Sequence, residues 1–174
     1  MDEEAKARFG EFVATRTPAL IRLAYLLTGD QHGAEDLLQT ALMKTASRWR
    51  HLRHKDPEAY IRTVMYRDQV SRWRRRRRRD EVPVHSPPEV PYADPSGHAD
   101  VRLTMRRALL CLPPDQRAVL VLRYYEDLPE TQVAELLDCS VGTVRSRTHR
   151  AVTRLRALLP ERATLAIQVP EDRP

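Results

Sequence analysis

The sequence contains few of the residues that build disulfide frameworks, metal sites and membrane spans. Only two of its 174 residues are cysteine, Cys111 and Cys139, and neither belongs to a CxxC pair. This excludes a disulfide framework and a cysteine-rich zinc site. No stretch of 18 apolar residues occurs, and the charged start MDEEAKARFGEF lacks the apolar segment of a secretory signal. We therefore expect a cytoplasmic protein with no membrane insertion, no metal site and no cofactor.

Lysine is also scarce, and the basic charge comes from arginine. The formal net charge is +6, the pI is about 9.7, and lysine accounts for only positions 6, 44 and 55 among 30 Lys and Arg residues. A GC-rich genome favours arginine codons, but the planar guanidinium also suits phosphates and guanine edges. Whether the arginines serve nucleic acid therefore depends on where they lie along the chain.

Residues 1–79 have the periodicity of amphipathic helices and no strand pattern. Apolar residues recur at three-and-four spacing over 34–49, which predicts a helix that follows Asp30. The pairs Thr17-Pro18 and Asp56-Pro57 each place a helix cap before a proline at the first helical position. We therefore expect further helices to begin at these two prolines, within the first of two domains.

A proline-rich segment separates this domain from the second one. Five prolines between residues 80 and 100 prevent a helix, and hydrophobic periodicity is absent there. This composition predicts an extended linker. Helical periodicity returns over residues 101–160, with new helices expected after Pro113 and at Pro129, and residues 161–174 form a tail. The sequence thus predicts an all-α protein of two small helical domains joined by an extended linker.

The second domain ends in a helix-turn-helix pattern. A short apolar stripe ends at Leu137, and a long one runs from Val141 to Leu158 after a three-residue turn. Ser140 is placed to cap the second helix, whose first turns carry Arg, Ser, Thr and His on the outward side, the residue types that read DNA grooves. A solvated basic face on a structural hairpin is the plainer alternative. The position of these residues near the helix N-terminus favours DNA binding.

A second basic feature is the run of seven arginines over 72–79, interrupted only by Trp73. Such density repels itself unless an anion neutralises it. The run continues a predicted helix near Trp49, Tyr60 and Tyr66, and arginine interleaved with aromatics is typical of surfaces on which unpaired bases stack. A disordered basic tail or a localisation signal is the alternative. Each aromatic alone is more often a core residue, and Tyr66 and Trp73 are the better candidates for stacking.

Three longer segments resemble the extracytoplasmic-function (ECF) group of bacterial RNA polymerase sigma factors. GDQHGAEDLLQTALMKTASRW is similar to the polymerase-binding helix of sigma domain 2, and DPEAYIRTVMYRDQVSRWRRRR to its promoter-melting helices. LPPDQRAVLVLRYYEDLPETQVAELLDCSVGTVRSRTHRAVTRLRALL is similar to sigma domain 4, and TGDQHGAEDLLQTAL with LRYYEDL indicates the SigE-type subgroup. The resemblance implies an alternative sigma factor, not an enzyme, that binds core polymerase and directs transcription from specific promoters. It assigns residues 1–79 to domain 2 and 101–160 to domain 4.

The resemblance also implies roles for individual residues. The polymerase would be contacted at its β′ clamp helices and β flap, the former by Asp36, Leu38, Gln39 and Leu42. The melted minus-10 strand, including a flipped base, would be held by His51, Arg53, His54, Lys55, Asp56, Tyr60, Tyr66, Arg67, Arg72, Trp73, Arg74 and Arg75. The minus-35 duplex would be met by Arg123, Ser140, Thr143, Arg145, Ser146, Arg147, His149 and Arg150. Whether an anti-sigma protein also binds is left open.

One departure from the family pattern lies in the helix before the arginine run. Such factors usually carry Asn and Asp where this chain has Arg67 and Ser71, which leaves its minus-10 preference open. Spacing adds a constraint, because two elements about 25 base pairs apart lie roughly 85 Å apart along B-DNA. A linker of about 20 residues reaches at most about 70 Å. Two domains each roughly 25 Å across therefore reach both elements only if polymerase holds them apart.

Two other functions fit parts of the sequence. A stand-alone dimeric helix-turn-helix regulator would explain residues 101–160, but it leaves the arginine run and the linker without a role. A nuclease that uses Glu35 and Asp36 would need a second carboxylate cluster to complete a metal site, and none stands out.

Overall fold

Helices joined by short turns make up the described part of the chain. The computed structural model describes residues 3–52, 55–78 and 98–159, and within them every regular element is a helix. In chain order they are α1 (Glu3–Thr28), α2 (Gln31–Ser47), α3 (Trp49–Leu52), α4 (Pro57–Arg78), α5 (His98–Leu110), α6 (Pro114–Leu120), the π-helical turn η1 (Val121–Tyr125), α7 (Glu130–Leu137) and α8 (Val141–Leu158). The predicted all-α fold is confirmed. None of these helices combines the length and apolar composition needed to cross a membrane.

The predicted linker and tail are mostly not described. Residues 79–97 and 160–174 lie outside the described ranges, and α5 begins at His98, inside the last three positions of the predicted linker. The helix-turn-helix pattern is confirmed, because α7 and α8 are joined by the turn at 138–140.

Side-chain caps begin three of the helices where the sequence predicted. Asp30, Asp56 and Ser140 each accept a hydrogen bond from the backbone N–H three residues further on, at 2.6, 3.0 and 3.1 Å. A helix N-terminus leaves several such N–H groups without a partner in the helix, and a cap satisfies one of them. The predicted starts of α2, α4 and α8 are therefore confirmed.

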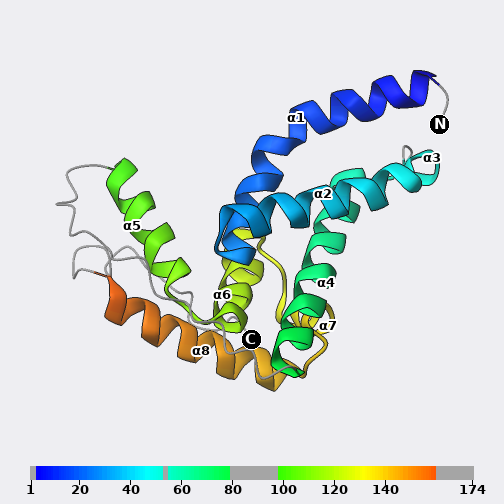
Figure 1. The fold of residues 1–174 in the computed structure, drawn as a ribbon. Coiled ribbons are helices and arrows are strands. Elements are labelled where there is room, and N and C mark those ends of the chain that lie inside the picture. The colour runs from blue at the N-terminus through cyan, green and yellow to red at the C-terminus, as the bar shows by residue number, and fades with distance from the viewer. Residues whose placement is uncertain (1–2, 53–54, 79–97, 160–174) are drawn as a thin grey trace.

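The predicted helix start at Pro18 is wrong. α1 begins at Glu3 and continues through Pro18, although a proline removes one helical hydrogen bond and bends the axis. Figure 1 shows α1 bent part-way along its length. Upstream of the proline, Phe9 and Phe12 pack against Trp49, with ring centroids 5.0 and 5.3 Å from it. This tertiary contact stabilises the first half of α1.

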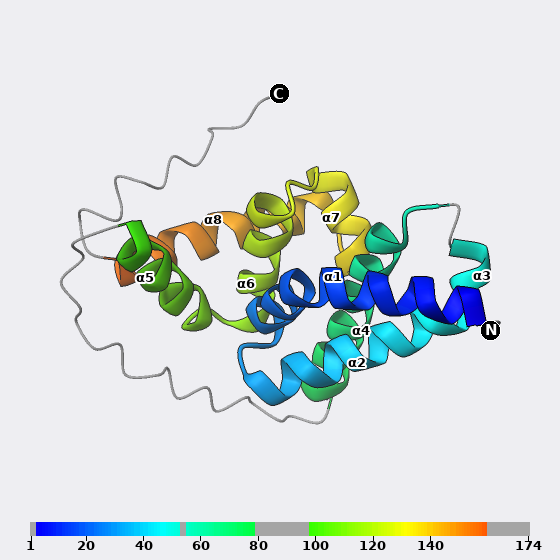
Figure 2. The same cartoon turned by 90° about the horizontal axis from the view of Figure 1, so that it is seen from above.

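The helices form two halves that contact each other. The N-terminal half, residues 3–78, has α1 packed against α2 with α4 across both, and the C-terminal half, residues 98–159, has α5, α6 and α7 against α8 (Figures 1 and 2). α1 contacts α6, and α4 contacts α7. The sites predicted on α4 and α8 therefore belong to one packed body.

One apolar core runs through both halves. It contains the fully buried side chains Leu20, Leu23, Leu37, Ile61 and Met65 from the N-terminal half and Val119, Leu122, Val133 and Val144 from the C-terminal half. Burying one such side chain contributes about 1.5–3 kcal/mol. A second core holds α5 and α6 on α8 through Ala108, Leu112, Leu120, Ala151, Val152 and Leu155. The shared core explains why the halves stay together.

A buried arginine lies where the halves meet. Arg117 of α6 is 0% exposed and donates hydrogen bonds to the backbone oxygens of Leu27 and Thr28, at 3.4 and 3.0 Å, and of Leu110, at 3.1 Å. The end of α1 carries partial negative charge, which favours a cation there. Burial lowers the pKa of Arg117 to about 10, so the guanidinium stays charged at neutral pH.

Gly29 makes room for this arginine. Its φ of +93° is unfavourable for any residue with a Cβ, and a Cβ would lie 2.8 Å from Nη2 of Arg117. Gly29→Ala should therefore destabilise the fold by about 2 kcal/mol, measured by thermal unfolding followed by circular dichroism.

Gly10→Ala is the matched control. Gly10 lies exposed within α1, and a Cβ there meets nothing within 4 Å. Alanine should stabilise this helix by about 0.5–1 kcal/mol. If both variants changed the free energy of unfolding in the same direction, the role assigned to Gly29 would be wrong.

Candidate nucleic-acid interface

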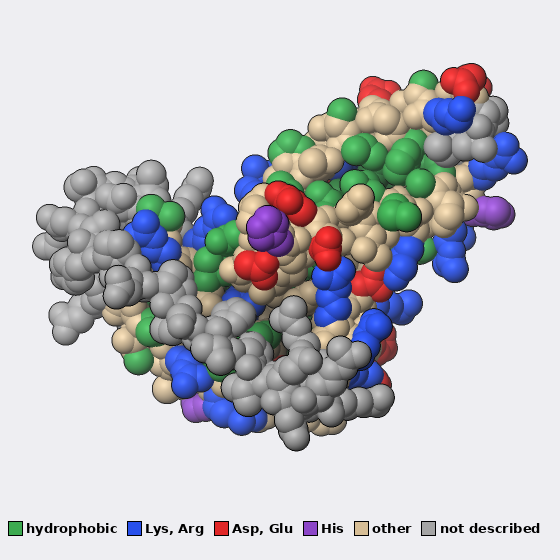
Figure 3. Space-filling view, in the orientation of Figure 1, with side chains coloured by type: hydrophobic (Ala, Val, Ile, Leu, Met, Phe, Trp, Pro, Cys, Tyr) green, Lys and Arg blue, Asp and Glu red, His purple; other side chains and the backbone are tan. Residues whose placement is uncertain are grey.

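α8 begins at a defined point and carries only positive charge. Asp138 takes a left-handed backbone with φ +46°, which reverses the chain after α7. Ser140 then caps α8, and its Oγ lies 2.9 Å from Oγ1 of Thr143. α8 contains five arginines and a histidine but no acidic residue. Figure 3 shows Arg and His side chains along the lower edge of the molecule, where α8 lies.

Four of the predicted minus-35 residues share the exposed face of α8. They are Arg145, Ser146, His149 and Arg150, at spacings that place side chains on one side of a helix. Nε of Arg145 donates to Oε2 of Glu130 at 2.8 Å, and the Arg145 side chain remains 67% exposed. Nε of Arg150 donates to the backbone oxygen of Ser146 at 3.1 Å. These contacts orient two arginines at the surface.

Two other predicted minus-35 residues lie within the packing of the C-terminal half. Nε of Arg147 is 3.7 Å from the Asp115 carboxylate on α6, and the Arg147 side chain is only 21% exposed. Nη1 of Arg123 donates to the backbone oxygen of Leu128 at 2.7 Å. Both arginines therefore lie away from the exposed face of α8. Arg147 contacts α6, and Arg123 bonds the segment before α7.

Part of the predicted minus-10 set lies at the surface beside the start of α4. His51, Lys55 and Arg67 are exposed, and Tyr60 is half-buried, two turns before Arg67 on the same side of α4. The guanidinium carbon of Arg48 lies 5.9 Å from the centre of the Tyr60 ring. Asp56 caps α4, and Arg75 bonds the backbone oxygen of Ser71. Arg53 and His54 lie outside the described residues.

The remaining minus-10 candidates point into the molecule or onto other helices. Tyr66 is 4% exposed, and Trp73 is half-buried against the shared core. Nη2 of Arg74 donates to the Asp138 carboxylate at 2.6 Å, while Nη1 of Arg72 lies 3.9 Å from Asp36. Of the two candidates favoured for stacking, Tyr66 is therefore covered in this structure and Trp73 is partly covered. Trp49 is likewise a core residue, 5% exposed.

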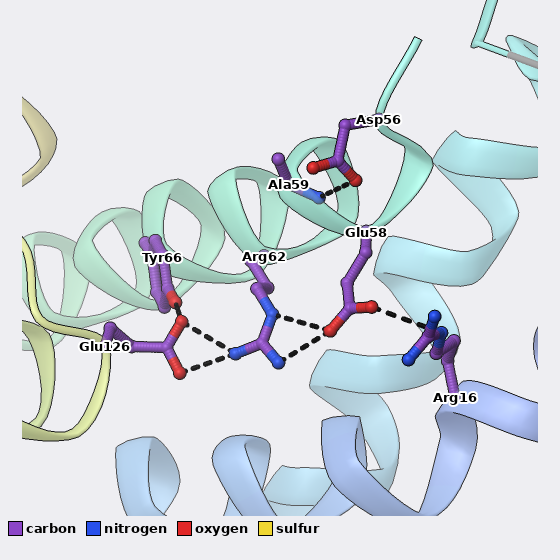
Figure 4. Close-up of polar contacts among 7 residues, drawn as sticks. All are labelled: Arg16, Asp56, Glu58, Ala59, Arg62, Tyr66 and Glu126. Atoms are coloured by element: carbon purple, nitrogen blue, oxygen red, sulfur yellow. Dashed lines mark hydrogen bonds and ion pairs between the residues drawn. The ribbon is translucent and has the colours of Figure 1, made fainter. Parts of the chain in front are cut away.

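A chain of charged groups joins α1, α4 and the segment after η1 (Figure 4). Nη1 of Arg62 donates to both carboxylate oxygens of Glu126, at 2.5 and 2.7 Å, and the hydroxyl of Tyr66 donates to the same carboxylate. Arg62 also bonds Glu58, whose other oxygen is 3.2 Å from Nε of Arg16.

These contacts change how the two α4 groups titrate. Burial raises the pKa of the Tyr66 hydroxyl far above its usual value, and the Glu126 carboxylate raises it further. Burial alone would lower the pKa of Arg62, but its bonds to Glu58 and Glu126 raise the pKa above the ordinary arginine value. Tyr66 therefore stays neutral and Arg62 stays charged, so both remain hydrogen-bond donors.

The predicted polymerase-binding residues on α2 divide into surface and core. Asp36 is 74% exposed at its side chain and Gln39 is exposed, whereas Leu38 is 5% exposed inside the core and Leu42 packs against it. Met43, 68% exposed, lies one turn beyond Gln39 on the same face. Met43 was not among the residues predicted from the sequence, although its spacing from Asp36 and Gln39 places it on their face.

The carboxylates on α2 do not assemble a metal site. Glu35, which the nuclease alternative requires, accepts a hydrogen bond from Gln31 at 2.6 Å. Across the described ranges, no group of three or more His, Cys, Asp and Glu side chains is close enough to hold a metal ion.

Comparison with known families finds the same two segments. Residues 12–79 match the family model described as sigma-70 region 2, and residues 102–155 match the one described as sigma-70, region 4. The first match includes α2 and α4, and the second includes α7 and most of α8.

Relatives match both halves together. An RNA polymerase sigma-E factor of Streptomyces coelicolor is 44% identical over 156 residues, covering 88% of this chain and 87% of the relative. An ECF RNA polymerase sigma factor SigE of Mycolicibacterium smegmatis is 33% identical over 180 residues, covering 96% of this chain and 67% of the relative. Among solved structures, the sigma factor RpoE in complex with the anti-sigma factor NepR from Bartonella quintana is 26% identical with a TM-score of 0.60, covering 92% of this chain and 98% of that one.

Proposed function

This chain belongs to the sigma-70 family, in its extracytoplasmic-function group, and is an alternative sigma factor that directs transcription initiation; we propose how its surfaces divide that work. In this proposal α8 reads the minus-35 duplex, the start of α4 holds the melted minus-10 strand, and α2 binds core polymerase. Residues 1–79 act as sigma domain 2 and residues 101–160 as sigma domain 4. The chain works in the cytoplasm and catalyses no reaction itself.

The charge of α8 is the observation that carries the proposal. Its five arginines and absence of acidic residues attract duplex phosphates, and its capped N-terminus adds a further positive end. Arg145, Ser146 and His149 lie on the exposed face at the turns that a recognition helix presents to base edges. This arrangement supports reading of the minus-35 duplex by direct contacts.

The start of α4 suits capture of unpaired DNA. Lys55 and Arg67 supply exposed positive charge, and Tyr60, with Arg48 over its ring, supplies an aromatic side chain near the surface. Opening duplex costs about 1.4 kcal/mol per stacking step, while stacking a base on an aromatic ring returns about 1–3 kcal/mol. Two captured bases would therefore offset much of the cost of melting a few pairs within a polymerase complex.

The exposed face of α2 suits a protein partner. Asp36 and Gln39 offer polar groups that confer specificity, and Met43 offers an adaptable apolar contact beside them. Leu38 and Leu42 hold α2 on the core, so the face is rigid. We assign this face to the β′ clamp helices of the polymerase, with the β flap contacting the C-terminal half.

Promoter spacing requires the two halves to separate. The minus-10 and minus-35 elements lie roughly 85 Å apart along B-DNA, whereas α4 and α7 are in contact in this chain. Binding of each half to its own site on polymerase would provide the energy for separation. By likeness to the Bartonella factor, solved with its anti-sigma protein, we also propose an anti-sigma protein among the partners.

A run-off transcription assay tests the function directly. Core polymerase with this chain should produce defined transcripts from genomic fragments, and core polymerase alone should not. Transcripts independent of the chain, or none from any fragment, would contradict the proposal.

Asp36→Arg tests the polymerase face. The substitution reverses one exposed charge on α2 without touching the core, so the fold should remain and co-purification with core polymerase should fall by at least tenfold. Glu135→Arg makes the same charge change on the exposed side of α7 and should leave assembly unchanged. Normal holoenzyme assembly by Asp36→Arg would refute this assignment.

Arg145→Ala tests base reading. Loss of a base contact should cost about 1–3 kcal/mol on the cognate minus-35 duplex and relax specificity at one position, whereas loss of a phosphate contact weakens all sequences and lowers the salt dependence. Arg154→Ala is the control, because Arg154 is also an exposed arginine of α8 but lies nine residues beyond Arg145, far from the capped N-terminal turns. An equal loss on cognate and scrambled duplexes would show that Arg145 does not read bases.

A further inference from the structure

The Glu126 carboxylate occupies a ready-made anion site on α4. Both of its oxygens are bound by Nη1 of Arg62, and one of them also accepts the hydroxyl of Tyr66. The side chain of Glu126 is only 8% exposed and that of Arg62 is 24% exposed, so the pair is largely shielded from water. Two donors one helical turn apart therefore converge on one anionic group, which comes from the other half of the molecule (Figure 4).

The charges around this site balance only while Glu126 is present. Arg16 and Arg62 contribute two positive charges, and Glu58 and Glu126 contribute two negative ones. Glu58 lies on α4 with Arg62 and stays with it when the halves separate. Removal of Glu126 would leave the cluster with one unmatched positive charge and the Tyr66 hydroxyl without its acceptor. Such a site favours another anion with exposed oxygens.

A second acidic residue of the C-terminal half, Asp138, contacts α4 closer to its C-terminal end. Nη2 of Arg74 donates to the carboxylate of Asp138 at 2.6 Å and to its backbone oxygen at 3.2 Å. This pair is more exposed than the first, with side chains 47% and 77% accessible, and so contributes less. Two arginines of α4, three turns apart, are thus both bound by the segment around α7.

We propose that Arg62 and Tyr66 form a phosphate site for the promoter strand on α4, and that Glu126 fills this site in the free chain as an internal competitor. The proposal rests on the function proposed for α4. The guanidinium and the hydroxyl suit a phosphodiester as well as a carboxylate, because both groups present oxygens to N–H and O–H donors. Tyr66, predicted from the sequence to stack on a base, becomes a phosphate ligand instead.

The contact between the halves combines features that hold it and features that weaken it. The shared core favours closure, but Arg117 is buried with carbonyls as its hydrogen-bond acceptors, and its Nε has no hydrogen-bond partner in the described part of the chain. A buried charge that is incompletely hydrogen-bonded opposes burial. Separation returns this guanidinium to water, which lowers the cost of releasing Glu126 from Arg62.

The first experiment measures binding of single-stranded DNA by the full chain. The probe is a fluorescein-labelled mixed-sequence 12-nucleotide strand, followed by anisotropy at low salt. Glu126→Gln should bind the probe roughly threefold to tenfold more tightly than the unchanged chain, because the competing charge is gone. Glu135→Gln removes the same charge from an exposed position of α7 and should have little effect.

A double variant assigns the gain to the site. Glu126→Gln combined with Arg62→Met should bind no more tightly than the unchanged chain. A gain that survives loss of Arg62, or an equal gain in Glu135→Gln, would overturn the proposal. The result needs no polymerase, so it can fail while run-off transcription succeeds, and the reverse also holds.

The second experiment measures whether the halves separate. Spin labels at Ser47→Cys and Thr153→Cys, in a Cys111→Ser and Cys139→Ser background, report the distance between α2 and α8 by pulsed electron paramagnetic resonance. Glu126→Gln should enlarge the long-distance population, and the charge-swapped pair Arg62→Glu with Glu126→Arg should restore the short distance without tighter DNA binding. A single long distance in the unchanged chain, or tighter binding by the swapped pair, would overturn the proposal. Circular dichroism of each variant checks that it is folded.

Discussion

The guanidinium of Arg117, buried against the carbonyl groups that end α1, is the contact on which the arrangement of the two halves depends. It enters from α6 and fixes the C-terminal half at one point of the N-terminal half. Because a buried cation tolerates few acceptor geometries, this contact sets the register between α1 and α6. The apolar core around it then brings α7 onto α4. The contacts of Arg62 with Glu126 and of Arg74 with Asp138 follow from that placement.

Much of the fold was predictable because its signals are local. The caps Asp30, Asp56 and Ser140 act within one helical turn, so the sequence predicted where three helices begin. The continuation of α1 through Pro18 was not predictable in this way. The first half of α1 is stabilised by the packing of Phe9 and Phe12 against Trp49, and the hydrophobic periodicity of α1 alone does not predict a contact with another helix.

The candidate site was predictable to the extent that a residue's role follows from its own helix. Arg145 and His149 lie outward on α8 as periodicity requires. Arg147 and Tyr66 have the residue types expected at a nucleic-acid surface, yet they pair with Asp115 and Glu126 from other elements. The sequence contains those carboxylates but not the packing that brings them close. Arginine density indicated nucleic acid as the ligand class, but it did not indicate which side chains bond to carboxylates within the chain.

The direction of the Glu126 side chain depends on one extra residue in the turn η1. The backbone N–H of Glu126 bonds the oxygen of Val121, five positions earlier, so this turn holds one residue more than an α-helical turn would. Without that residue, the chain after it would rotate by about 100° about the helix axis. In-frame loss or gain of one codon within 121–125 would therefore turn the Glu126 carboxylate away from α4, and α7 and α8 would turn with it. The length of this one turn thus decides whether the two halves can meet through Glu126 and Arg62.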